Sequence, residues 1–116
     1  MTIPVEIMLR HDERVFTETI DHPRDADAWT AVDLEQILKA ILARIDRIQH
    51  PGRPDQPPVS LRGMNWIVSP YQQGVAIAFE IPSASAVAGP FSLAQEALER
   101  LMTEAFAASR PPTTIH

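Results

Sequence analysis

The side chains that could do chemistry in this chain are its histidines and the carboxylates beside them. His11 is followed directly by Asp12 and Glu13. Imidazole and carboxylate groups are common general acids, general bases and metal ligands in proteins. Three consecutive residues in a tight turn rarely aim at one point, however. The pattern therefore favours a solvated hairpin turn without a catalytic or metal-binding role.

A second cluster consists of His22, Asp25 and Asp27. A curled loop could bring these side chains together, but their spacing matches no metal-binding motif. Both aspartates also precede a predicted helix, whose N-terminal dipole favours negative charge. A polar loop before a helix is therefore the preferred interpretation, and we expect neither a metal nor a cofactor.

Further catalytic motifs are absent from the sequence. The chain has no cysteine, which excludes thiolate catalysis and cysteine-ligated metals. It contains no GxSxG, GxGxxG, HExxH or phosphate-loop motif. The serines within residues 83–86 could supply a nucleophile, but no positioned base is visible for them. We expect no catalytic residues.

Residues typical of binding surfaces gather around one predicted strand, and they are Arg62, Asn65, Trp66 and Tyr71. Arginine, tryptophan and tyrosine are favoured at the energetic centres of protein interfaces. They form a candidate interaction surface, although a core position is the preferred interpretation for Trp66. The alternative is a small-molecule pocket between the sheet and the helices, or at a dimer seam. Its polar contacts would be His22, Asp25, Arg62 and Tyr71.

Composition limits the class of protein. A chain of 116 residues fits one domain, predicted over residues 1–108, with a proline-rich connector at 50–58 and a flexible tail at 109–116. The formal net charge of −5 argues against binding to nucleic acid. No apolar run reaches membrane-spanning length, and the N-terminus does not resemble a signal peptide. We therefore expect a cytoplasmic protein.

The elements that must position any site begin with a helix predicted over residues 30–49. Its apolar residues recur at steps of three and four, which is typical of a helix with one buried face. Thr30 is the predicted N-cap, with Asp33 as the acidic partner of a capping box. Pro51 and Gly52 end the helix.

Alternating apolar residues predict four strands, and a second apolar stripe predicts another helix. The strands span residues 3–9, 14–20, 59–69 with a bulge at Gly63, and 75–81, and the helix spans 92–108 with Ser92 and Gln95 as a capping box. Residues 83–90 are expected to form a small apolar loop. The fold class is α+β in the order ββαββα: a four-stranded antiparallel sheet of two hairpins with both helices on one face. The two ββα halves are either a duplication or two similar solutions to one packing problem.

The expected function follows from the uncovered side of such a sheet. Helices on one face leave the other face open, and a symmetric homodimer would hide leftover apolar surface and an edge strand. The first hypothesis is a self-associating protein-interaction module without catalytic activity, which binds a protein or peptide partner. The second is a small-molecule-binding protein or a modest enzyme.

Overall fold

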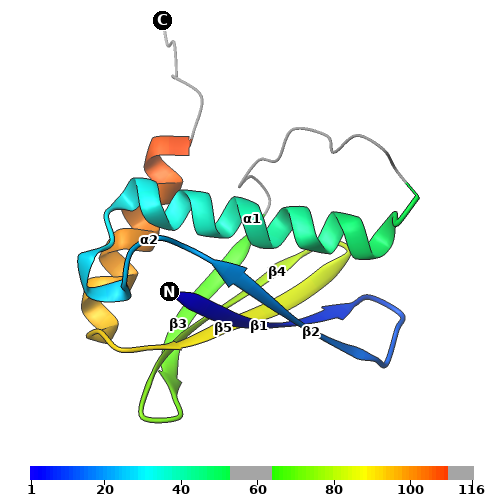
Figure 1. Ribbon diagram of the computed structural model, residues 1–116, viewed down its shortest axis with the longest axis horizontal. Coiled ribbons are helices and arrows are strands. Elements are labelled where there is room, and N and C mark those ends of the chain that lie inside the picture. Colours follow the sequence, from blue (N-terminus) through cyan, green and yellow to red (C-terminus); the bar gives the residue numbers. More distant parts are fainter. Residues whose placement is uncertain (53–63, 110–116) are drawn as a thin grey trace, which may run out of the picture.

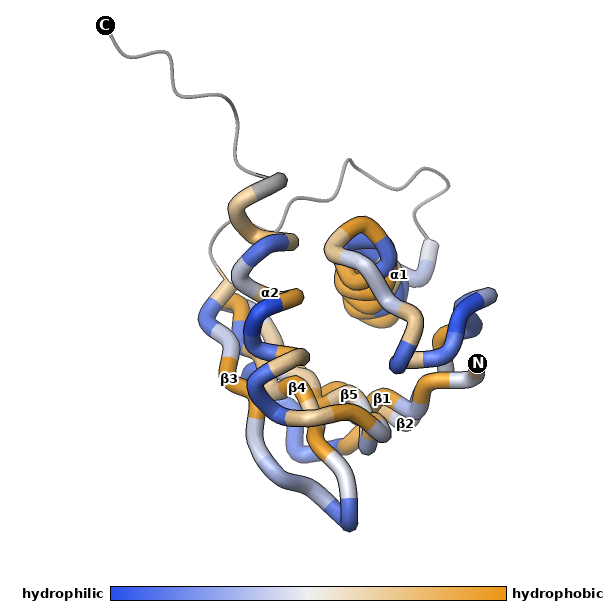
Figure 2. Tube along the Cα trace, turned by 90° about the vertical axis from the view of Figure 1, so that its left-hand side faces the viewer, coloured by the Kyte–Doolittle hydropathy of each residue, from blue (hydrophilic) through white to orange (hydrophobic). Residues whose placement is uncertain are grey.

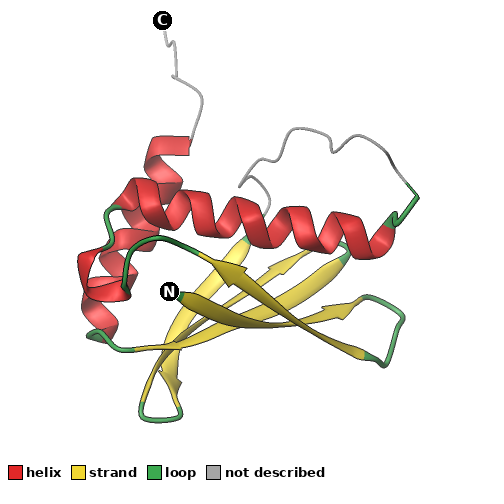
Figure 3. Ribbon diagram, viewed as in Figure 1, coloured by secondary structure: helices red, strands yellow, loops and turns green. Residues whose placement is uncertain are grey.

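Two helices lie over one face of a five-stranded antiparallel sheet (Figures 1 and 3). The computed structural model describes residues 1–52 and 64–109. Its strands lie side by side in the order β2-β1-β5-β4-β3. The elements in chain order are β1 (Thr2–Leu9), β2 (Val15–Asp21), a short 3-10 helix (Ala26–Ala28), α1 (Ala31–Gln49), β3 (Asn65–Tyr71), β4 (Gly74–Ile81), β5 (Ala84–Phe91) and α2 (Gln95–Ser109).

The hairpin of β1 and β2 confirms the predicted alternation. Ile3, Val5 and Ile7 are buried on the helix side of β1, whereas Glu6 and Met8 are exposed on the other side. β1 and β2 pair antiparallel around the polar turn that was expected at residues 11–13.

The predicted first helix is also confirmed. Thr30 is the N-cap of α1, and its hydroxyl oxygen accepts a hydrogen bond from the backbone N–H of Asp33. The Asp33 carboxylate in turn accepts from the backbone N–H of Thr30, which completes the capping box. The buried stripe of α1 packs on the sheet and on α2, and it consists of Leu34, Ile37, Leu38, Ile41, Leu42 and Ile45.

The prediction of a loop at residues 83–90 is wrong, because this segment forms β5 in the middle of the sheet. It pairs with β1 on one side and with β4 on the other. Alanine, glycine and proline are poor strand formers, so the local pattern does not predict a strand. Two flanking strands override that preference, and the small side chains of Ala84, Ala86 and Ala88 are buried on the helix side. The sheet therefore has five strands, the order is ββαβββα, and the two halves do not share one element order.

Two boundaries differ from the prediction. α2 begins at Gln95 rather than at residue 92, and its first turn closes from the N–H of Leu98 to the carbonyl of Ala94. β3 continues to Tyr71, so the turn consists of two residues, Gln72 and Gln73, with φ of 48° and 66°. Residues 53–63, which include most of the predicted connector, the bulge and the start of the third strand, lie outside the described residues, as do residues 110–116.

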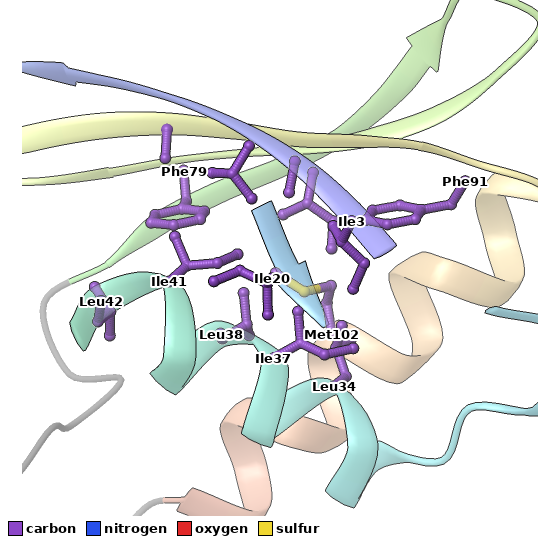
Figure 4. Close-up of a cluster of buried hydrophobic side chains, with 14 of the residues drawn as sticks. Ile3, Ile20, Leu34, Ile37, Leu38, Ile41, Leu42, Phe79, Phe91 and Met102 are labelled. Carbon is purple, nitrogen blue, oxygen red and sulfur yellow. The ribbon is translucent and has the colours of Figure 1, made fainter. Parts of the chain in front are cut away.

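The core lies between the sheet and the two helices. Figure 2 shows both helices on the same side of the sheet, and Figure 4 shows the buried side chains that fill the space between them. Ile41 from α1 and Ile77 from β4 are fully buried, as is Met102 from α2. The helices leave the opposite side of the sheet uncovered by any described element, and this side is called the open face below.

Candidate functional site

His22 is part of a buried polar pair, but its partner is Asp33 rather than the predicted Asp25 and Asp27. The Nε2 atom of His22 lies 3.1 Å from the Oδ1 atom of Asp33, and both residues are buried. Asp25, the N-cap of the 3-10 helix, and Asp27, within it, are exposed and do not take part. Within residues 1–52 and 64–109, no group of three potential metal-ligating side chains comes together.

Hydrogen bonds hold the Asp33 carboxylate in its charged form. The backbone N–H of Thr30 donates to its Oδ2 atom at 2.8 Å, and this bond is the main reason that the pKa of Asp33 lies below its usual value. Burial opposes that shift, while His22 and the Thr30 hydroxyl add to it. The Asp33 side chain thus bonds both the N-cap of α1 and the His22 ring, which points to a structural role.

The turn at His11 is also structural. The Asp12 carboxylate accepts hydrogen bonds from the side chain of Arg14, and these lower the pKa of Asp12. His11 is exposed and has a φ of 68°. The Asp12 carboxylate is therefore engaged by Arg14 rather than by His11 or Glu13.

Asn65 and Trp66, two of the predicted interaction residues, face opposite sides of the sheet. Asn65 is exposed on the open face, whereas Trp66 points to the helix side, where its ring centroid lies 5.9 Å from that of Phe106. Tyr71 is half-buried at the end of β3, and Arg62 lies outside the described residues.

The polar contacts expected for a small-molecule pocket are not brought together either. His22 follows β2 and Tyr71 ends β3, and these two strands are opposite edges of the sheet. Asp25 is exposed near His22. The described members of this set therefore share no pocket.

The open face is the strongest candidate site because it exposes large apolar side chains. Met8, Val15 and Ile67 lie there, and their exposed fractions are 49%, 51% and 60%. Only Val32, on α1, is a comparably exposed large apolar residue in the described part of the chain. Strand register and alternation place these residues on the open face: Thr2, Pro4, Glu6 and Met8; Val15, Thr17, Thr19 and Asp21; Asn65, Ile67 and Ser69; Ala78 and Glu80; Ser85 and Val87.

Two adjoining hollows mark the open face. One of about 600 Å³ lies where β4 turns into β5, and its lining includes Met8, Arg10 and Glu80. The other, of about 370 Å³, is lined in part by Ile67 and by Val87 on β5. Both hollows share Asn65, Glu80 and Ser85, so they adjoin one another, and residues of four strands line them together.

The strands contribute only acidic charge to the open face, although Arg10, directly after β1, lines the larger hollow. None of the five strands contains lysine, arginine or histidine, although together they contain four carboxylates. Three of these, Glu6, Asp21 and Glu80, lie on the open face. The fourth, Glu18, lies on the helix side, where its Oε1 atom accepts from Arg44 at 3.0 Å. The sequence alone did not show this absence, because the strands predicted over 14–20 and 59–69 include Arg14 and Arg62.

Comparisons with known proteins give no information about the site. No protein-family model, curated protein or solved structure matches this chain. Neither helix of the described residues is long and apolar enough to cross a membrane.

Proposed function

We propose that this chain is a non-enzymatic protein-interaction module that self-associates and that binds another protein through the open face. The observation behind this proposal is the concentration of exposed apolar side chains there. A solvated face of an antiparallel sheet normally carries polar residues. Apolar groups gathered on one surface mark interaction sites. Met8, Val15 and Ile67 depart from the normal pattern on the same face.

The carboxylates of the open face favour a partner with basic side chains. Glu6 and Glu80 form no ion pair within the described residues. Two copies packed face to face would oppose these carboxylates to one another, which is unfavourable. A basic amphipathic segment suits the surface better, because its apolar side chains would cover Ile67 and its arginines or lysines would pair with the glutamates.

A designed peptide tests this proposal. The probe is a labelled 18-residue amphipathic helix with leucines on one face and arginines beside them, about five turns long. Its control carries glutamate in place of arginine. Fluorescence anisotropy should show binding of the arginine peptide that weakens with added salt, because the charges are exposed. Equal binding of the two peptides, or binding of neither, would contradict the proposal.

A pair of matched variants locates the binding surface. Ile67→Ser removes an apolar side chain that is 60% exposed, and Val32→Ser removes one that is 61% exposed on α1. Full burial of such a side chain contributes about 1.5–3 kcal/mol, so covering the exposed part of Ile67 contributes about 1–2 kcal/mol. We therefore expect the Kd to rise roughly 5- to 30-fold for Ile67→Ser. The Kd should stay unchanged for Val32→Ser.

The larger hollow supports a second candidate function. Its volume of about 600 Å³ suits a small molecule, and Asn65, Glu80 and Ser85 line it together with apolar residues. It lies on the open face rather than between the sheet and the helices, and the carboxylate of Glu80 favours a ligand with an amine. A fragment screen by thermal shift tests this function. A primary amine that stabilises the wild type but not Glu80→Gln would favour it over docking of a protein segment.

A further inference from the structure

β2 presents an edge of the sheet with which no strand pairs within the described residues. The N–H of His22 donates to the Met1 carbonyl at 2.9 Å, and the Met1 amino group donates to the His22 carbonyl at 2.6 Å. Two reciprocal hydrogen bonds of this kind mark a hydrogen-bonded residue pair. Such pairs alternate with non-hydrogen-bonded pairs along an antiparallel ladder. Phe16, Glu18 and Ile20 therefore bond to β1. The backbone N–H and C=O groups that point outward belong to Val15, Thr17, Thr19 and Asp21.

The opposite edge, formed by β3, is protected. Its two-residue turn makes Tyr71 and Gly74 the closing hydrogen-bonded pair, so Trp66, Val68 and Pro70 point their backbone groups outward. Pro70 has no N–H to offer. The side-chain amide of Gln95, at the start of α2, donates to the Val68 carbonyl at 3.1 Å. Proline and a covering side chain are two ways in which proteins prevent pairing at a sheet edge.

β2 has none of these protections. Its sequence, VFTETID, contains no proline, lysine or arginine, and most of its residues are β-branched or aromatic. All four outward-facing residues keep both backbone groups free of any hydrogen bond to other described residues. The contrast between the two edges singles out β2 as the edge that accepts another strand.

We infer that the chain forms a two-fold symmetric dimer in which β2 pairs antiparallel with β2 of a second copy. A strand can always pair with itself in this way, because the two-fold axis reverses its direction. In one register Thr17 opposes Thr19 of the second copy and Val15 opposes its Asp21, so all four outward-facing residues form hydrogen bonds. Shifting the register by one pair leaves some of these groups unbonded. The favoured register also places Phe16 opposite Ile20 on the helix side, a favourable aromatic and β-branched pair.

Glu18 lies on the two-fold axis in this register, opposite its own copy. Two carboxylates directly opposite one another destabilise a sheet. Each is paired within its own chain with Arg44, at 3.0 Å, which reduces the repulsion. We therefore expect Glu18→Gln to lower the dimer dissociation constant, whereas a dimer formed elsewhere would not respond to this change.

The dimer specifies the self-association part of the proposed function and does not depend on docking at the open face. Joining the two sheets at β2 leaves both open faces uncovered and on one continuous sheet. The dimer would therefore offer two docking surfaces side by side, which strengthens binding to a partner with two segments. The two proposals can fail separately, because a monomer could still bind the amphipathic peptide.

Engineered cysteines test the register, since the wild-type chain has none. Opposed residues in a hydrogen-bonded pair have Cα atoms about 5.5 Å apart, within the range for a disulfide. Under mild oxidation a mixture of Thr17→Cys and Thr19→Cys should give a mixed disulfide dimer, while each variant alone should give little. Glu18→Cys alone should cross-link, and Ser69→Cys on β3 serves as the control. Cross-linking of Ser69→Cys in preference to the β2 variants would overturn the inference.

Light scattering during size-exclusion chromatography gives the independent readout. The wild-type chain should elute as a dimer. Thr19→Pro removes an N–H that points outward, so the variant should be a folded monomer by circular dichroism, while Thr19→Ala remains a dimer. A wild-type monomer at every concentration, or a dimer that survives Thr19→Pro, would overturn pairing at β2. A monomeric wild type that still binds the arginine peptide would leave the open-face proposal intact.

Discussion

Replacing Ala86 with proline tests the position of β5 inside the sheet. Ala86 is 3% exposed and lies between Ile7 of β1 and Phe79 of β4. Proline removes a ladder hydrogen bond that contributes about 0.5–1.5 kcal/mol, and it leaves a buried acceptor unbonded at a cost of about 1–3 kcal/mol. We therefore expect a loss of about 1.5–4.5 kcal/mol, with steric conflict of the ring adding to it. Chains of this length have a total stability of about 6–17 kcal/mol.

Urea denaturation followed by circular dichroism measures this loss. We expect the midpoint of Ala86→Pro to fall by about 1 M or more if the variant folds. Thr19→Pro is the matched control at protein concentrations where the wild type is monomeric, because its N–H points away from β1 and proline is tolerated at such edge positions. A stability of Ala86→Pro within about 1 kcal/mol of the wild type would refute the placement of residues 84–91 as a central strand, because only a loop or an edge strand tolerates that change.

Three further predictions concern α1 and the polar residues near it. Ile41→Asp should abolish cooperative unfolding in urea, because Ile41 is 0% exposed and a charge there has no partner; a folded variant would mean that α1 buries a different face. The lowered pKa of Asp33 contributes stability that is complete above about pH 4 and is lost as the pH falls through the lowered pKa. Asp33→Asn should therefore be less stable than the wild type at neutral pH, and this difference should shrink in acid. His11→Asn retains a residue that tolerates positive φ, so thermal stability and peptide binding should not change.

The parts of the fold that were predictable from sequence rest on local patterns. The apolar stripe of α1 and the capping box of Thr30 and Asp33 involve residues within a few positions of one another. β5 was not predictable in this way, because Ala84, Ala86 and Ala88 have weak strand preference and become a strand only between β1 and β4. Its central position also decides which faces and edges of the sheet are exposed.

The candidate site was predictable only in outline. Helices on one side of an antiparallel sheet imply an open face, and the alternation in β1 already separates Met8 from the buried residues. The location of Ile67 depended on the register of β3 against β4. The pairing of His22 with Asp33 joins a loop to a helix cap across eleven positions, and no spacing rule indicates it.

The pairing of β1 with β5 also determines when the chain can fold during synthesis. Val5 opposes Ala88, so the two central strands lie 83 positions apart in the sequence (88 − 5). A ribosome adds about 5–20 residues per second, so β1 is made on the order of 4–16 s before its inner neighbour. Through that interval the nascent hairpin exposes both the apolar side of β1 and an unpaired backbone edge. Contacts between such distant segments also slow folding. Nascent chains should therefore depend on chaperones until residue 91 has left the ribosome, which ribosome profiling of chaperone-bound chains would detect as release after that point.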